Sequence, residues 1–126
     1  MTEQFSLQFF KDILNEVPEM SILSVFTNEI GIVTNYFKES KIEYKTIDNC
    51  YCLTLSEEVK RKLLSLAKNK KIHDYFMHLY VDYKEQPQLK IYDHLEYGEI
   101  SKNFLVSERF KNEYVNKQYC VTSKSF

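Results

Sequence analysis

Apolar residues at the start of the chain recur with the spacing of an amphipathic helix. The stripe consists of Phe5, Phe9, Phe10, Ile13, Leu14 and Val17. Pro18 cannot continue a helix because it lacks a backbone N–H, so the pattern predicts a helix over residues 4–16. The apolar run 20–26 that follows fits either a strand or the lead-in to a second helix.

Two further helices are predicted downstream. Residues 27–40 show an apolar stripe behind Thr27 or Asn28 as the N-cap, although the interior Gly31 costs about 1 kcal/mol relative to alanine. Residues 57–69 follow Ser56, with two glutamates in the first turn and lysines at the far end. That charge order complements the helix dipole and makes this helix the best marked element.

Alternating apolar and polar residues predict strands in the middle of the chain. Residues 41–47 alternate in this way, and a turn at 48–49 leads into a second strand over 50–55. Cys50 and Cys52 point to the same face of that second strand, and we expect both to be free thiols.

A long hairpin is predicted next, from segments 73–83 and 89–97 joined by the five residues KEQPQ. So short a connection requires antiparallel pairing. Ser107 then caps a predicted helix with the sequence ERFKNEYVNK, and the final residues QYCVTSKSF form either a short strand or a tail.

One register of this hairpin separates an apolar face from a mixed face. It places Val81 opposite Ile91, Tyr83 opposite Leu89, Met77 opposite Leu95, Tyr75 opposite Tyr97 and Leu79 opposite Asp93 on the core face. On the other face it pairs Asp82 with Lys90, Tyr80 with Tyr92, His78 with His94 and Phe76 with Glu96.

The mixed face combines tyrosines with charged side chains, which is the composition of protein–protein contact regions. A second layer of helices over this face is the alternative, with tyrosine hydroxyls reaching its edge. The sequence leaves both arrangements open.

Taken together, the predicted helices and strands indicate an α+β fold in a single domain over residues 1–126. We expect an antiparallel sheet of about four to five strands, with three to four helices packed mainly on one face.

The charge distribution indicates which partners are expected. The formal net charge is −1, so no basic domain favours nucleic acid. Residues 72–100 carry six acids and two bases, which suits a basic protein partner. The chain has no apolar run of membrane-spanning length and no basic leader, so we expect no membrane association and a cytoplasmic location.

Familiar catalytic and cofactor motifs are absent from the sequence. Three cysteines without C-x2-C spacing predict no zinc site, and two glycines leave little material for phosphate-binding loops. We expect no cofactor and no metal. An enzyme that uses a cluster of His78, His94 and Asp93 is an alternative, since a partly buried Asp93 would suit general acid–base chemistry.

The segments YFMHLYVDY and KIYDHLEYGEI give the chain the character of a small α+β protein with an acidic, tyrosine-studded sheet. In this it resembles bacterial immunity proteins. The resemblance implies a non-catalytic inhibitor that covers the active site of a basic toxin domain; a homodimerising scaffold is a further alternative. The expected partner-binding residues are Phe76, His78, Tyr80, Asp82, Tyr92, Asp93, His94, Glu96, Tyr97 and Glu99.

Overall fold

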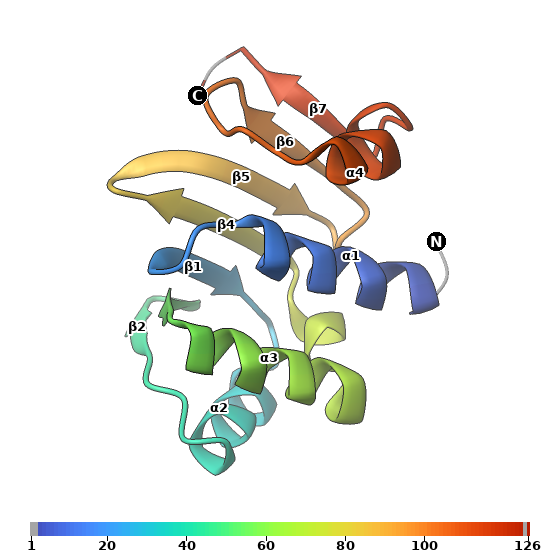
Figure 1. Ribbon diagram of the computed structural model, residues 1–126. Helices are drawn as coiled ribbons and strands as arrows, with labels where there is room; N and C mark the ends of the chain where they lie inside the picture. The colour runs from blue at the N-terminus through green and yellow to red at the C-terminus, as the bar shows by residue number, and fades with distance from the viewer. Residues whose placement is uncertain (1–2, 125) are drawn as a thin grey trace.

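Strands from the whole length of the chain form one sheet. The computed structural model describes residues 3–124 and 126, and within them seven strands lie in the order β2-β3-β1-β4-β5-β6-β7 (Figure 1). The strands are β1 Ser21–Phe26, β2 Lys45–Ile47, β3 Cys50–Leu55, β4 His78–Tyr83, β5 Gln86–Tyr92, β6 Tyr97–Ser101 and β7 Cys120–Ser123. All neighbours pair antiparallel except β6 and β7, which are parallel.

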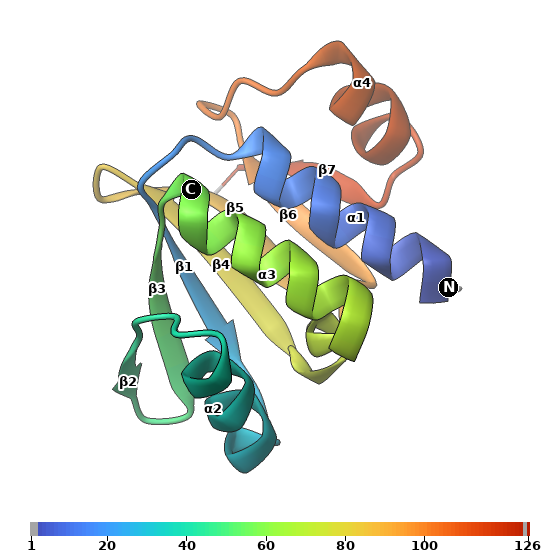
Figure 2. The same ribbon diagram turned by 60° about the horizontal axis from the view of Figure 1, so that its bottom comes forward.

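The helices pack against one side of this sheet (Figure 2). They are α1 Glu3–Glu16, α2 Ile30–Glu39, α3 Glu57–Lys70 and the short α4 Glu108–Phe110, with a 3-10 turn η1 over Ile72–Tyr75 and a π-helical turn η2 over Lys111–Val115. The predicted α+β class is confirmed, and the sheet has more strands than the four to five expected.

The locally marked helices form where the sequence predicts them. The Ser56 side chain accepts a hydrogen bond from the Val59 N–H, and Lys71 ends α3 in the left-handed conformation with φ 54°. The predicted cap of α2 is wrong. The Thr27 hydroxyl oxygen accepts a hydrogen bond from the N–H of Glu29, which is itself the N-cap residue. α2 therefore begins at Ile30, and Thr27 does not cap it.

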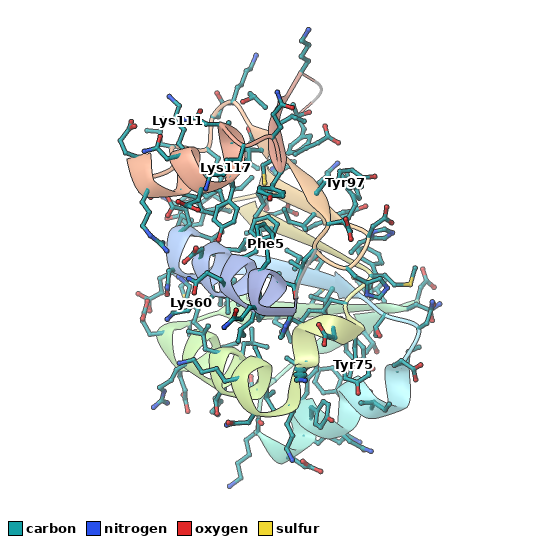
Figure 3. The ribbon with its side chains drawn as sticks, turned by 90° about the vertical axis from the view of Figure 1, so that its right-hand side faces the viewer. Phe5, Lys60, Tyr75, Tyr97, Lys111 and Lys117 are labelled. Atoms are coloured by element: carbon teal, nitrogen blue, oxygen red, sulfur yellow. The ribbon has the colours of Figure 1, made fainter. Side chains whose placement is uncertain are left out.

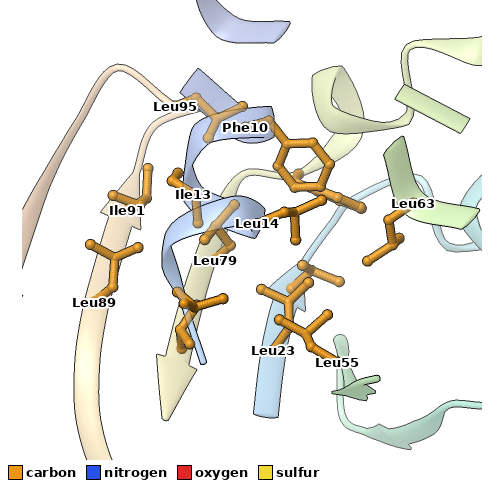
Figure 4. Close-up of a cluster of buried hydrophobic side chains, with 14 of the residues drawn as sticks. Phe10, Ile13, Leu14, Leu23, Leu55, Leu63, Leu79, Leu89, Ile91 and Leu95 are labelled. Carbon is orange, nitrogen blue, oxygen red and sulfur yellow. The ribbon is translucent and has the colours of Figure 1, made fainter. Parts of the chain in front are cut away.

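The core lies between α1, α3 and the near face of the sheet (Figure 4). Phe10, Ile13 and Leu14 of α1 are at most 1% exposed and cover side chains from the central strands. The strand residues of this core include Leu23, Leu55, Leu79, Leu89 and Ile91. Because side chains alternate along a strand, their neighbours in sequence point to the opposite face.

The β4–β5 hairpin differs from the predicted one because its turn is shorter. Lys84 and Glu85 have φ values of 51° and 64°, which gives a two-residue turn with both residues left-handed. The five-residue connection was therefore wrong, and Tyr80 pairs with Lys90 rather than with Tyr92. The pairing also shifts after Val81, so Asp82 pairs with Pro87 rather than with Lys90.

The two predicted hairpin strands were also drawn too long. Residues 72–75 form η1, so β4 begins only at His78. The predicted strand 89–97 divides, because three consecutive residues, Asp93–Leu95, have positive φ and turn the chain back into β6. The predicted pairs that involve 75–78 and 94–97 therefore do not form.

At the two edges of the sheet and in the C-terminal helix, the structure agrees with the prediction only in part. The predicted strand 41–47 is regular only over β2, and Ile42, which precedes β2, is buried in the core. At the other end, Ser107 caps α4 as predicted, by accepting a hydrogen bond from the Phe110 N–H. Within the final segment, for which a short strand or a tail was predicted, Cys120–Ser123 form the strand β7, and residue 125 lies outside the described residues.

Candidate partner-binding face

The side of the sheet opposite the helices forms a surface that we call the open face. Its residues are Ile22, Ser24, Phe26, Lys45, Ile47, Cys50, Cys52, Thr54, His78, Tyr80, Asp82, Lys90, Tyr92, Tyr97, Glu99 and Val121. Ile22, Tyr97 and Val121 are 38%, 49% and 52% exposed. In Figure 3, Tyr97 points away from α1 and α4. The described helices thus leave this face uncovered, which decides between the two arrangements that the sequence left open.

Strand register sets aromatic rings side by side across the open face. Phe26 pairs with His78 between β1 and β4, and Tyr92 pairs with Tyr97 between β5 and β6. The Tyr80 ring lies 5.1 Å from that of Phe26 and 6.0 Å from that of Tyr92, measured between centroids. The Tyr92 and Tyr97 centroids are 5.4 Å apart. We call these five residues the aromatic row.

The rings of the aromatic row meet at tilted or edge-to-face angles, between 37° and 74°. These are the geometries that aromatic pairs favour, and each such contact adds about 0.5–1.5 kcal/mol beyond its buried area. The row is therefore held in place before any partner arrives, which lowers the entropy lost on binding.

Charged groups flank the aromatic row. The Lys90 Nζ lies 5.5 Å from the centroid of the Tyr80 ring and 4.6 Å from that of Phe126. The Tyr92 hydroxyl donates a hydrogen bond of 3.2 Å to Glu99 Oε1. Lys90, the lysine beside the aromatic row, is thus packed against rings, while Asp82 and Glu99 place negative charge next to the row.

Burial raises the pKa of Tyr92 to about 12, and the hydrogen bond to Glu99 acts in the same direction because it favours the neutral hydroxyl. Unfolding returns this pKa to its ordinary value of 10.0. The contribution of Tyr92 to stability is therefore complete below pH 10 and decreases as the pH rises toward 12.

We expect the titration of Tyr92 to be visible by NMR of protein carrying 13C-labelled tyrosine. One ring resonance should move with a midpoint near 12, and Tyr92→Phe should remove it. Glu99→Gln should lower this midpoint because it removes the nearby negative charge. A Tyr92 midpoint near 10 would contradict both the burial of its hydroxyl and the hydrogen bond to Glu99.

Most of the predicted partner-binding residues lie on or beside the open face. On the face are His78, Tyr80, Asp82, Tyr92, Tyr97 and Glu99; in the turn between β5 and β6 are Asp93, His94 and Glu96. The prediction for Phe76 was wrong. Its ring is 1% exposed and lies 5.8 Å from that of Phe10, so it belongs to the core.

The predicted histidine and aspartate cluster takes a different form. The Asp93 N–H donates a hydrogen bond of 3.3 Å to His78 Nδ1, and His94 Nδ1 lies 3.1 Å from the Asp74 carbonyl oxygen. Asp93 does not lie opposite Leu79 on the core face; it is exposed in the turn. Asp93 is therefore not the partly buried acid that the sequence suggested for acid–base work.

Metal-ligating side chains are dispersed. Among the residues that the structure describes, no three histidine, cysteine, aspartate or glutamate side chains gather as a metal ion would require. Cys50, Cys52 and Cys120 are free thiols.

Sequence reasoning missed the contribution of β1. Ile22, Ser24 and Phe26 extend the open face because β1 lies between β3 and β4. The alternation in SILSVF was a usable signal for a strand, but nothing local indicates that β1 lies beside the hairpin.

Comparisons with protein-family models, with curated proteins and with solved structures gave no match. No helix in the described part of the chain is both long and apolar enough to cross a membrane.

Proposed function

We propose that this protein binds another protein through the open face, and that it acts as a cytoplasmic immunity protein that neutralises a bacterial toxin. The observation that carries the proposal is the aromatic row, which lies partly exposed on a sheet face that the described helices leave uncovered. Exposed aromatic clusters with a polar rim supply most of the binding energy in protein interfaces.

The charges of the open face favour a basic partner. Asp82 and Glu99 flank the rings, and Glu96 and Asp93 are exposed in the adjoining turn. The ammonium group of Lys90 is held over the rings of Tyr80 and Phe126. A basic toxin domain would be steered toward such a surface, and its arginine side chains can stack on tyrosine rings.

The direct test measures binding to the toxin domain encoded beside the gene. We expect a 1:1 complex by isothermal titration calorimetry, together with loss of toxin activity in the complex. Tyr97→Ala should weaken binding by about tenfold or more, because a truncated hot spot costs at least 1–2 kcal/mol. Tyr97 suits this test because its exposure leaves the fold little affected.

A matched control is Tyr75→Ala. Tyr75 is also partly exposed, but its ring packs 6.2 Å from that of Tyr36 at the helical side of the molecule. This variant should bind as the unaltered protein does. Equal affinity of the Tyr97 variant, or a gene neighbourhood without any toxin, would contradict the proposal. A dimer that Tyr97→Lys dissociates would instead assign the open face to self-association.

A further inference from the structure

A groove of about 690 Å³ runs along the outer edge of β3. Its volume lies within the range of roughly 300–1,000 Å³ that is typical of ligand sites. Ile22 and Thr54 line it from the open face, whereas Val59 lines it from the helical side. The groove therefore follows the edge of the sheet and is reached from both faces.

The groove exists because β2 is short. β2 pairs with Cys50–Cys52 only, whereas β1 pairs with the whole of β3 on the other side. Before Lys45 the chain leaves the sheet, since the Tyr44 ring packs 5.6 Å from Phe37 and 5.3 Å from Tyr51. No strand of the described residues continues beside Leu53–Leu55 on this edge.

The backbone of β3 directs a donor into the groove. In an antiparallel ladder, alternate residues turn their N–H and C=O groups to opposite sides. Ile47 and Cys50 flank a two-residue turn, so Cys50, Cys52 and Thr54 face the β2 side. The Leu55 carbonyl faces the β1 side, where it accepts from the Met20 N–H at 2.8 Å. The Thr54 carbonyl accepts from the Ser56 N–H at 3.0 Å.

Lysines dominate the rim of the groove. Lys41 and Lys45 are exposed, and Lys62 donates to the Lys41 carbonyl at 3.1 Å and pairs with Glu58 at 3.2 Å. Glu43 is the other acid of the lining. Lys62 and Glu58 offset each other, which leaves Lys41 and Lys45 against Glu43, so the rim carries a net positive charge and favours a negatively charged ligand.

We propose that this groove binds an extended peptide with acidic side chains, which adds to the edge of β3 as a short strand. Successive side chains of a strand point to opposite faces. One side chain of the bound peptide would contact Ile22 and the next would contact Val59. The carboxylates of the peptide would pair with Lys41 and Lys45. A carbonyl of the peptide accepts the Thr54 N–H. The site is separate from the aromatic row and does not depend on the function proposed for the open face.

The test is an NMR titration of the 15N-labelled full chain with the capped peptide Ac-Glu-Val-Glu-Val-NH2. We expect the amide resonances of Thr54 and Lys45 to shift, and hydrogen exchange at Thr54 to slow. Ac-Lys-Val-Lys-Val-NH2 is the control and should bind at least about tenfold more weakly because its charges are reversed. Lys45→Glu should weaken binding of the acidic peptide by a similar factor.

Thr54→Pro tests the backbone contact. Proline removes an N–H that faces away from β1, which an edge position of a sheet tolerates. This variant should lose peptide binding, whereas Thr54→Val, which keeps the N–H, should retain it. If Thr54→Pro does not fold, the effect of Lys45→Glu on binding of the acidic peptide tests the proposal instead.

Three outcomes would overturn the proposal. They are the absence of shifts at Thr54 with peptide in millimolar excess, equal binding of the two peptides, and cross-strand NOEs between Glu43 and Thr54. The last of these would show that the protein's own segment 41–44 pairs with this edge.

Discussion

Replacing Asp12 by alanine is expected to lower the free energy of unfolding by about 3 kcal/mol, because it leaves a buried hydroxyl without its acceptor. Asp12 lies on α1 and is 3% exposed. Its Oδ2 accepts a hydrogen bond of 2.5 Å from the Tyr114 hydroxyl, and its Oδ1 accepts from Arg109 at 3.0 Å and from Gln8 at 2.9 Å. Urea denaturation of the variant measures the loss.

This carboxylate joins the C-terminal region to the rest of the molecule. The ring of Tyr114 in η2 stacks on that of Phe9, with centroids 4.5 Å apart. Glu16 at the end of α1 also accepts hydrogen bonds from the Ser107 backbone and side chain. The expected loss therefore includes looser packing of α4 and η2 against α1.

Two variants separate the partners of Asp12. Arg109 is 65% exposed in its side chain, so Arg109→Ala should cost less than about 1 kcal/mol. Tyr114→Phe should cost more than Arg109→Ala, because the Tyr114 hydroxyl donates in a buried place where water cannot replace it, whereas the Arg109 side chain is largely exposed. If Asp12→Ala proves no more costly than Arg109→Ala, the buried hydrogen bond to Tyr114 does not stabilise the fold as argued.

The elements predicted well are those whose signals are local. α1 and α3 follow from apolar spacing, and α3 also has a serine cap and charges that match its dipole. β3 follows from alternation bounded by the turn at 48–49. In each case the residues that form the element also carry its boundaries.

The turns around β5 could not be predicted because no local residue marks them. Lys84 and Glu85 both take positive φ without a glycine or asparagine, and so do Asp93, His94 and Leu95. Pro87 belonged to the predicted connection KEQPQ, yet it lies inside β5 at a place where the pairing shifts. The predicted connection between β4 and β5 was therefore too long, and β5 and the start of β6 were predicted as a single strand.

The open face was predicted correctly in part, for a geometric reason. The predicted register differs from the observed one by two residues over Leu79–Val81, and an even shift keeps each side chain on its own face. Tyr80 and Tyr92 consequently share a face in both. Whether helices would cover that face depends on contacts between distant segments, which the sequence pattern does not specify.

Phe76→Ala is expected to lower the free energy of unfolding by about 3–5 kcal/mol, which is the usual cost of removing a large buried ring. The hydrophobic and polar pattern placed this residue on the binding face, but the structure places it between η1 and β4 under α1. At 1% exposure its removal leaves a cavity beside Phe10, whose packing limits how far the site can collapse.

Tyr97→Ala is the matched comparison for Phe76→Ala, since it also removes an aromatic ring. Tyr97 is 49% exposed and its ring contacts only that of Tyr92 within the aromatic row, so its loss should cost about 0.5–1.5 kcal/mol, well below the cost of Phe76→Ala. The two variants should therefore lose different properties. Phe76→Ala should mainly lose stability, whereas Tyr97→Ala should mainly lose binding to the partner. If Phe76→Ala unfolded at the same urea concentration as the unaltered chain but lost its partner, residue 76 would belong to the open face, and the placement of η1 under α1 would be wrong.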